Sequence, residues 1–503
     1  MNEDQFEKLK SISDKYLKNI FLNNYIGFIS WLYVVRPHPQ NMKDYDDLFK
    51  NKTNYYFFYE LKKFFYSLVK ILIKLLKYII FKKRIYYSSI NVKKNSTDLL
   101  ILSHLINYKD IGKKNDFYFS NISNLLKNVN IDSLLVLKNP NQYNENKSIY
   151  NWKRKKIERI ILPNYTNFIN ELVFIIKALS VRKFIKKKLY FNNNTSLDRK
   201  FHNQLLTECL SESTISSFRL NFQIKKIVKM LNPKIIMLTY EGFAWERVIF
   251  KSCREINENI ICIGYQHSLI NKYYYNVKKN IFNGFDPDVV LTSGECGYNI
   301  FRNEKNFNIK KLLNVGTHRS FHYFQKRKFY KNKNSDLNII VLPEGFMNET
   351  NLLFEFTLNC AKILPNIQFI WRMHPVIDFS IFKKKYPKYK IIPKNIKISY
   401  NTLDQDLAIS KFAIYRGSTS IIAAFNFNVQ PILLDLNNSY LIDPLHNMQN
   451  VCLKIRKEEE LVKIISNKNY IIKSNIGISD FFYSSFKKNI FLDFFKSQIN
   501  NNE

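Results

Sequence analysis

The spacing of apolar residues divides the chain near residue 96. Before that point apolar residues recur at helical intervals, most clearly from Leu61 to Tyr87, a stretch without acidic residues. At about 100° per residue, the lysines of this stretch fall on one side of the helix and the bulky apolar residues on the other. The lysines are Lys62, Lys63, Lys70, Lys74 and Lys77, and the apolar residues are Phe65, Leu68, Leu72, Leu75, Leu76 and Ile79. We therefore expect residues 1–95 to form a helical extension.

The charge pattern of this helix indicates a partner. A helix with a purely basic face opposite a bulky apolar face is suited to lie in the plane of an anionic membrane. The alternative is a surface helix that packs on the protein core and keeps its lysine face in water. We favour the membrane because ordinary surface helices mix positive and negative charges. The five lysines are the expected membrane-binding residues.

From Asp98 onwards, short apolar runs alternate with helical segments. Apolar runs without polar alternation are typical of strands buried in a parallel sheet. The runs span 99–102, 133–137, 157–162, 235–238, 260–263 and 289–291. Helices are expected at 119–127, 167–178 and 201–230, with a basic loop at 182–188. The pattern predicts one doubly wound α/β domain over residues 96–320.

A second alternating pattern follows a basic, turn-rich linker at 321–335. It begins with the apolar run 337–342 and ends after the run 431–435, which predicts another α/β domain over residues 336–470. In residues 471–503, an aromatic helix from Ser479 to Gln498 is expected to pack back on the first domain. The predicted fold class is α/β, with two parallel-sheet domains.

The composition indicates which binding partners and which cellular compartment to expect. The formal charge is +37, which indicates an anionic partner such as nucleic acid, a membrane surface or an acidic substrate. The six cysteines are scattered without a C-x-x-C pair, which argues against a disulfide frame or a zinc site and fits a reducing cytoplasm. Met1–Lys18 is too polar for a signal peptide, and the apolar stretch Phe21–Val35 is short for a bilayer span. We expect no spanning helix.

The glycines mark where a ligand is expected. Eight of the 11 glycines fall between Gly242 and Gly417, in a chain whose composition otherwise disfavours glycine. In such a chain, a glycine suggests a backbone position that approaches a ligand or adopts a positive φ. The working site is therefore expected within residues 240–420.

Two strand-to-loop transitions carry a candidate phosphate site. After the apolar residues Ile414 and Tyr415, the chain runs through Arg416, Gly417, Ser418, Thr419 and Ser420 into an Ala-rich helix. A glycine that admits close approach, followed by hydroxyls at a helix start, is suited to bind an anion. The alternative is that the serine is simply an N-cap.

About 45 residues earlier, Arg372 and His374 follow another apolar run and are expected to meet the same anion. Glu344 follows the first strand of this domain, where it either bonds donor hydroxyls or caps the next helix. Asp404 and Asp406 are expected to mark the start of a surface helix. No aspartate pair suggests a metal site, so we predict transfer without a metal or cofactor.

Polar loops at the ends of the first-domain strands carry a candidate base. Glu241 directly follows an apolar run and precedes a glycine, a pattern that exposes a carboxylate at the edge of the sheet. Glu246 lies in the following helix, where Arg247 and Arg254 are expected to pair with it. Glu241 is therefore the preferred catalytic base and His267 is the second choice.

The motifs resemble those of a known group of enzymes. Arg372-Met373-His374-Pro375 is similar to the His-Pro motif, and Ser418-Thr419-Ser420 to the Ser-Ser motif, of bacterial capsule sialyltransferases and polysialyltransferases. CDP-glycerol glycerophosphotransferases carry similar elements. The two predicted α/β domains in series, joined by a short linker and closed by a terminal helix, also resemble the GT-B glycosyltransferase architecture, which implies two domains facing a cleft. Tyr240–Ser268, Asp286–Tyr298 and Leu342–Asn351 also resemble uncharacterised surface-carbohydrate biosynthesis proteins. The resemblance covers about 235–445 and assigns the donor phosphate to His374, Ser418 and Ser420.

The resemblance implies a function. It predicts a glycosyltransferase that moves a sugar from a nucleotide sugar, with a CMP-sugar favoured, to a surface polysaccharide or lipopolysaccharide acceptor. Its expected partners are the donor, a glycan or glycolipid acceptor and the anionic inner face of the bacterial plasma membrane, where the protein is peripheral. A teichoic-acid-type glycerophosphotransferase, a sugar-nucleotide epimerase and a non-catalytic assembly protein are the alternatives. We expect no nucleic-acid partner, because the basic residues are dispersed and no recognised module holds them.

Overall fold

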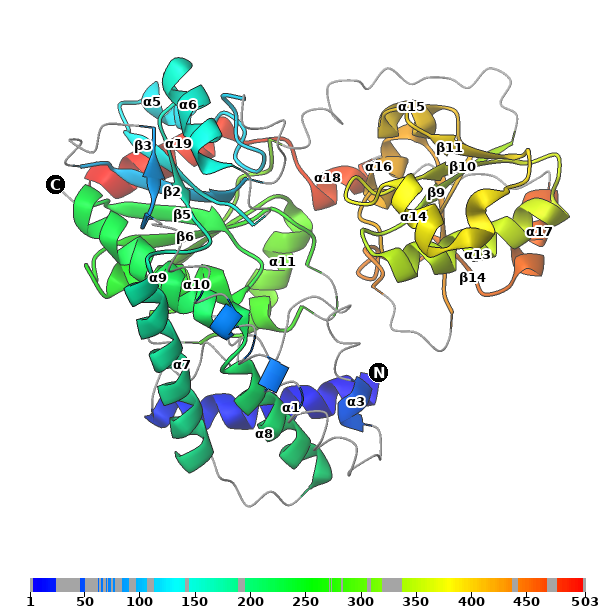
Figure 1. The fold of residues 1–503 in the computed structure, drawn as a ribbon. Helices are drawn as coiled ribbons and strands as arrows, with labels where there is room; N and C mark the ends of the chain where they lie inside the picture. Colours follow the sequence, from blue (N-terminus) through cyan, green and yellow to red (C-terminus); the bar gives the residue numbers. More distant parts are fainter. Residues whose placement is uncertain are drawn as a thin grey trace.

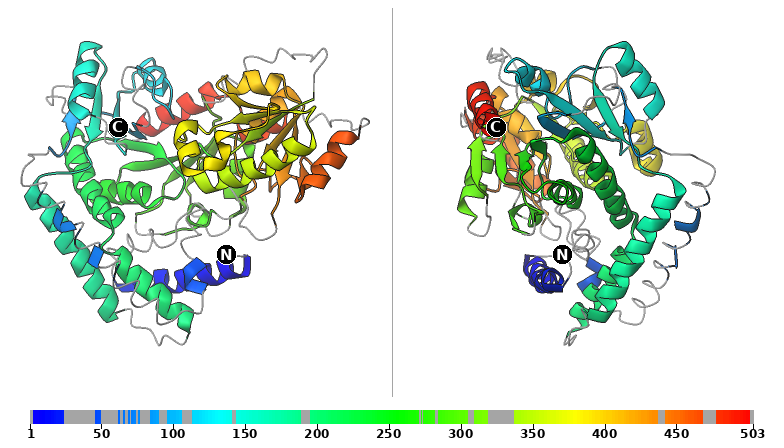
Figure 2. Two further views of the ribbon diagram at one scale, coloured as in Figure 1. Left: turned by 45° about the vertical axis from the view of Figure 1, so that its right-hand side comes forward. Right: turned by 90° about the vertical axis from the view of Figure 1, so that its left-hand side faces the viewer.

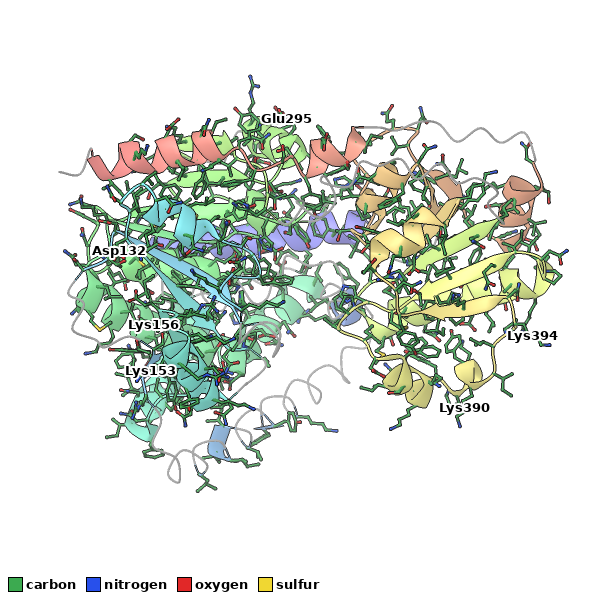
Figure 3. All side chains as sticks on the ribbon, turned by 90° about the horizontal axis from the view of Figure 1, so that it is seen from above. Asp132, Lys153, Lys156, Glu295, Lys390 and Lys394 are labelled. Carbon is green, nitrogen blue, oxygen red and sulfur yellow. The ribbon has the colours of Figure 1, made fainter. Side chains whose placement is uncertain are left out.

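The computed structural model describes the chain in a set of ranges separated by gaps. They are residues 3–23, 46–49, 62, 65–66, 69, 71–73, 76, 84–89, 96–105, 113–140, 144–188, 195–270, 272, 274–281, 284–304, 309–318, 337–436, 442–467 and 477–500. These ranges form two α/β domains that lie side by side (Figure 1). Viewed from above, Lys153 and Lys156 lie on the first domain, and Lys390 and Lys394 lie on the far side of the second (Figure 3).

The first domain is built on an eight-stranded sheet. Its strands are β1 (Tyr87–Ser88), β2 (Leu99–His104), β3 (Ser133–Lys138), β4 (Arg159–Leu162), β5 (Ile235–Thr239), β6 (Ile261–Gln266), β7 (Val289–Thr292) and β8 (Lys311–Asn314). The order across the sheet is β1-β4-β3-β2-β5-β6-β7-β8, and every pair is parallel except β1 with β4. The order reverses between β2 and β5, and ligands of open α/β sheets bind at such a switch point.

Helices cover both faces of this sheet. Alternate strand residues enter two separate cores, because successive side chains of a strand point to opposite faces. One core holds side chains of α9 (Glu212–Leu231), α10 (Ala244–Arg254) and α11 (Glu295–Asn303). The other holds side chains of α5 (Ile122–Lys127), α6 (Glu145–Arg154) and α19 (Lys488–Asn500). The doubly wound arrangement expected from the apolar runs is therefore confirmed.

A third core joins a layer of helices to the first domain. It contains residues of α1 (Glu3–Asn23), α3 (Asp46–Phe49), α7 (Phe168–Lys188) and α8 (Ser196–Glu208), together with Ile71. α7, α8 and α1 lie together at the lower end of the first domain (Figure 1). None of the helices in the described ranges combines the length and the apolarity needed to cross a membrane.

Two details of this layer differ from the expectation. The basic segment 182–188, expected as a loop, is the last part of α7. The single helix expected at 201–230 is divided into α8 and α9, because the Ser211 side chain accepts the Thr214 N–H and begins a new helix.

The second domain repeats the plan of the first with six parallel strands. They are β9 (Asn338–Leu342), β10 (Gln368–Arg372), β11 (Ile396–Ser399), β12 (Phe412–Tyr415), β13 (Gln430–Leu434) and β14 (Leu453–Ile455). Their order is β11-β10-β9-β12-β13-β14, so the switch point lies between β9 and β12. Side chains of α13 (Met347–Ile363), α14 (Phe379–Lys385) and α17 (Glu458–Ser466) enter the core on one face. The second domain also contains the short helices α15 (Leu403–Ala408) and α16 (Ile421–Ala424) and the 3-10 turns Pro387–Lys390 and Phe425–Phe427. A further 3-10 turn, Asn276–Lys278, lies between β6 and β7 of the first domain.

The C-terminal segment connects the two domains. Phe482 of α18 (Ile478–Phe482) is buried with second-domain side chains, whereas Phe491 and Phe495 of α19 are buried in the first-domain core. The single helix expected over 479–498 is therefore two helices, and the red C-terminal ribbon passes from one domain to the other (Figure 2). Gly294 allows the crossing, since a Cβ there would lie 2.2 Å from the Phe482 carbonyl oxygen.

Candidate functional site

A cavity of about 510 Å³ lies between the two domains, at the switch point of the second sheet. Its walls come from the second domain, from the loop after β6 and Thr317 in the first domain, and from α18. The polar lining residues are His267, Ser268, Tyr274, Thr317, Arg372, His374, Ser418, Thr419, Ser420, Asn426, Ser479 and Tyr483. The His-Pro and Ser-Ser motifs, distant in sequence, therefore line one cavity.

The loop after β12 brings Gly417 close to Glu344, so that a side chain at position 417 would require the Glu344 carboxylate to move. A Cβ on Gly417 would lie 2.1 Å from Oε1 of Glu344, closer than any real contact. Glu344 follows β9, so the two residues that flank the switch point touch each other. The helix after Glu344 has Phe346 as its N-cap, with no side-chain hydrogen bond.

Three hydroxyl residues continue this loop into the cavity. Ser418 is buried, Thr419 is exposed and Ser420 is half-buried. Ser420 is the N-cap residue of α16, but its side chain makes no capping hydrogen bond. The helix expected here is a four-residue α16 that continues as a 3-10 turn, so its dipole is small. Hydroxyls and backbone N–H groups are thus the main hydrogen-bond donors that this wall offers to a ligand.

His374 lines the same cavity from the loop after β10. Its Nδ1 accepts a hydrogen bond from the Val376 N–H at 3.4 Å, which leaves Nε2 as the protonated nitrogen of the neutral ring. Burial lowers the pKa of His374, which favours this neutral form. Gly345 lies against the ring, with a Cβ position 3.1 Å from Nδ1. His374 therefore offers one N–H donor.

The two arginines of the motifs are held by carboxylates. Arg372 lines the cavity, but its guanidinium donates to the Asn401 carbonyl and to buried Asp406. Arg416 is buried behind the loop, where its Nε donates to Glu349 at 2.7 Å. Asp404 and Asp406 lie in the first turn of α15, where a helix start was expected, but Asp406 is fully buried beside Arg372 and does not face the surface.

The first domain contributes a carboxylate and a histidine. Glu241 follows β5 and His267 follows β6, and their Oε1 and Nε2 atoms are 3.8 Å apart. His267 is 7% exposed and lines the cavity, whereas Glu241, with 19% of its side chain exposed, is not one of the lining residues. The Tyr118 ring packs edge-on against His267 at 4.5 Å between centroids. The two residues predicted as base and second choice are therefore neighbours at the cavity.

The surroundings of Glu241 are arranged by Glu246. Both carboxylate oxygens of Glu246 accept the Glu241 N–H, at 2.9 and 3.1 Å, and one also accepts the Phe243 N–H. Burial raises the pKa of Glu246 well above its usual value, and the charge of Glu241 acts in the same direction. Arg247 and Arg254, expected to pair with Glu246, pair instead with Asp286 and Asp288.

Two further basic residues meet at this edge of the first sheet. His104 ends β2 and Lys138 ends β3, and both contact the Trp245 ring, at 4.8 and 4.1 Å from its centroid. Burial lowers the pKa of Lys138 to about 7 and that of His104 well below its usual value. Neither residue was predicted from the sequence, although each follows an apolar run, Lys138 directly and His104 after Ser103, and such a position is the signal that identified Glu241.

The predicted membrane-binding lysines lie largely outside the described residues. Lys62 is described and exposed, but Lys63, Lys70, Lys74 and Lys77 are not among the described positions. In the ranges that the structure describes, no group of three or more His, Cys, Asp or Glu residues is placed to hold a metal ion.

Several solved structures are similar to this chain in fold. UDP-GlcNAc 2-epimerase from Methanocaldococcus jannaschii is 12% identical, with a TM-score of 0.46 over 79% of this chain and 99% of that chain. UDP-GlcNAc 2-epimerase from Neisseria meningitidis, bound to UDP-GlcNAc, is 10% identical, with a TM-score of 0.42 over 80% of this chain and 100% of that chain. The glycosyltransferase SnogD from Streptomyces nogalater is 8% identical, with a TM-score of 0.42 over 79% of this chain and 100% of that chain. No protein-family model and no curated protein sequence matches the chain.

Proposed function

We propose that the protein is a glycosyltransferase that uses a nucleotide-sugar donor. The observation that carries the proposal is the cavity between the domains, which has anion-binding groups on one wall and a histidine backed by a carboxylate on the other. Glycosyl transfer requires these two functions in one place, because negative charge develops on the leaving phosphate while the acceptor hydroxyl loses a proton.

The second domain would hold the donor. The backbone and hydroxyls of Ser418, Thr419 and Ser420 would donate to the phosphates, and the Nε2–H of His374 would donate from the facing loop. Arg372 and Arg416 would act indirectly, by fixing the positions of the two loops through Asp406 and Glu349. Glu344, beside Gly417, is suited to accept hydrogen bonds from hydroxyls of the donor.

The first domain would activate the acceptor. Glu241 is the proposed base, and His267, which lines the cavity, lies 3.8 Å from it. The acceptor proton would pass to His267 or directly to Glu241, while the acceptor oxygen attacks the anomeric carbon and the nucleotide leaves with the bonding electron pair. The Glu241 N–H bonds to Glu246 keep this carboxylate in a fixed loop position.

The finer assignment follows the motif resemblance. We propose a CMP-sugar donor, a surface polysaccharide or lipopolysaccharide acceptor, and a peripheral position at the inner face of the bacterial plasma membrane. A teichoic-acid-type glycerophosphotransferase would use the same phosphate pocket, so it remains the nearest alternative. The two are distinguished by the nucleotide and by the group that appears on the acceptor.

A thermal-shift screen with CMP, CDP, UDP and GDP tests the proposal. A nucleotide that binds the folded state raises the Tm by mass action, and CMP is expected to give the largest shift. His374→Ala should remove most of that shift, whereas Lys394→Ala, an exposed position on the far side of the domain, should preserve it. The proposal fails if none of the nucleotides shifts the wild-type protein, or if the His374→Ala variant responds as the wild type does.

A further inference from the structure

Helix α7 has apolar side chains on two opposite faces. Phe174, Ala178, Val181 and Ile185 are buried in the core shared with α1 and α8. On the opposite face, a stripe is exposed to between 38% and 69%, although an apolar helix face normally packs against another surface. The stripe consists of Ile169, Leu172, Val173, Ile176 and Leu179.

A second exposed apolar stripe comes from the region before β1. The described residues between 62 and 76 are helical, and Ile71 is buried in the same core as the inner face of α7. Val69, Leu72, Ile73 and Leu76 are 48% to 63% exposed. Two segments thus share one core and each leaves an apolar stripe outside it. Together they hold about half of the large apolar side chains that are exposed in the described part of the chain.

The charges beside these stripes have one sign. On α7, the apolar stripe gives way toward the C-terminal end to exposed Lys183, Lys186 and Lys187, with Lys177 at its edge. The acidic residue of the helix, Glu171, is buried and bonded to Arg219. Lys62 is exposed at the start of the second stripe. Lysine is depleted at protein–protein interfaces, whereas apolar residues flanked by lysines match the depth profile of an anionic bilayer surface.

We infer that the exposed face of α7 and the exposed residues Val69, Leu72, Ile73 and Leu76 form a docking face for an anionic phospholipid bilayer. The apolar stripes would enter the boundary between headgroups and acyl chains, and the lysines would contact the lipid phosphates. α7 lies at the end of the first domain that is remote from the second domain (Figure 1). The membrane contact therefore extends to a helix of the first domain itself, not only to the N-terminal extension.

The position of α7 also links the docking face to the acceptor side of the site. α7 follows β4, and the Asn164 side chain between them donates to the Asn139 carbonyl at 2.6 Å, next to Lys138. If the proposed transferase function holds, this link favours an acceptor that is anchored in the same bilayer. The docking inference itself does not depend on catalysis.

Vesicle flotation tests the docking face with the full-length protein. Wild-type protein should float with phosphatidylcholine vesicles that contain phosphatidylglycerol and bind vesicles of phosphatidylcholine alone much more weakly. Replacing Ile169→Glu together with Ile176→Glu should weaken binding by about tenfold or more, because both side chains would otherwise enter the bilayer. Ile381→Glu, with a similar exposure on α14, is the matched control and should bind normally.

The charge requirement is tested separately. Lys183→Glu with Lys187→Glu should reduce binding to the anionic vesicles and leave the weak binding to neutral vesicles unchanged. The inference is overturned if the wild type stays with the soluble fraction, or if the α7 glutamate variant floats as the wild type does. It is also overturned if light scattering without lipid reveals a dimer that the same variant dissociates, since a second copy would then cover the face. The nucleotide screen reports the transferase function independently of either result.

Discussion

Glu241 and His267 are neighbours, and of the two it is His267 that lines the cavity. His267 lines the cavity, and the Glu241 carboxylate is 3.8 Å from its Nε2. A carboxylate in this position can accept a proton through the imidazole or orient the ring, and both roles require its negative charge.

Glu241→Gln should therefore lower kcat by about 10²–10⁴ while nucleotide binding is retained. Single-turnover transfer measures the change in rate, and the CMP thermal shift, measured on the same preparation, measures nucleotide binding. Glu355→Gln, an exposed surface glutamate paired with Lys388, should have neither effect. A variant with wild-type kcat would remove Glu241 from the mechanism.

Lys138 is a second residue whose surroundings determine its chemistry. Burial lowers its pKa to about 7 from the usual value of 10.5, although the carboxylate of Glu246 acts in the opposite direction. Between these two pKa values the unfolded chain binds more protons at this site than the folded one. The free energy of unfolding therefore gains a term that increases with pH across that window.

Lys138→Met removes this term. The difference in unfolding free energy, wild type minus Lys138→Met, should rise as the pH increases from about 7 to about 10.5, and urea titrations across this range measure it. Lys394→Met, at an exposed position, should run parallel to the wild type. Parallel curves for Lys138→Met as well would contradict a lowered pKa.

At the scale of elements, a buried ion pair fixes α7 against α9. Arg219 donates to Glu171 with two bonds, of 2.8 and 2.7 Å, and both side chains are nearly inaccessible. The same carboxylate also accepts from the backbone and hydroxyl of Thr166, just before α7. Glu171 therefore links α7 to α9 and to the segment just before α7, in addition to the packing of the buried apolar face of α7.

Glu171→Ala should lower the free energy of unfolding by about 3–5 kcal/mol, because it leaves the Arg219 charge buried without its main partner. Equilibrium urea unfolding measures the change. Glu212→Ala is a stringent control, since Glu212 also contacts Arg219, at 3.5 Å, but is 46% exposed. Its cost should be at most about 1 kcal/mol. An equal loss of unfolding free energy in the two variants would show that burial does not strengthen the Arg219–Glu171 ion pair.

At the scale of the whole molecule, the end of the chain completes the core of the first domain. α18 packs with the second domain and α19 with the strands of the first. Phe495 is fully buried more than 180 residues after the last strand of that sheet. The C-terminal segment therefore joins the two domains, because its two helices pack in different cores.

Phe495→Ala should destabilise the first domain by about 3–5 kcal/mol, through lost apolar burial and the cavity that remains. Hydrogen exchange should locate the loss in β2, β3 and α5, which contribute to the same core. Ile490→Ala on the same helix, 45% exposed, should change stability by less than about 0.5 kcal/mol. Faster exchange confined to the second domain would contradict this assignment.

The periodicity of the sequence determined much of the fold. The buried strands, the parallel α/β class and the two domains follow from local spacing, because a strand covered on both faces must be apolar at successive positions. The Gly417–Ser420 and Arg372–Pro375 loops were also visible locally, as strand ends that lead into polar turns. The boundaries assigned to the domains and the roles assigned to the site residues remain predictions.

Only the tertiary structure decided which side chains meet. Arg372 and Asp406 are separated by 34 residues, and Arg416 and Glu349 by 67, so no local pattern distinguishes an arginine that binds a ligand from one that pairs in the interior. Likewise, His104, Lys138 and Glu241 converge because β3, β2 and β5 are adjacent in the sheet. Strand order depends on long-range packing, whereas the spacing of residues along the chain depends on local backbone geometry, which explains why the elements could be predicted and their contacts could not.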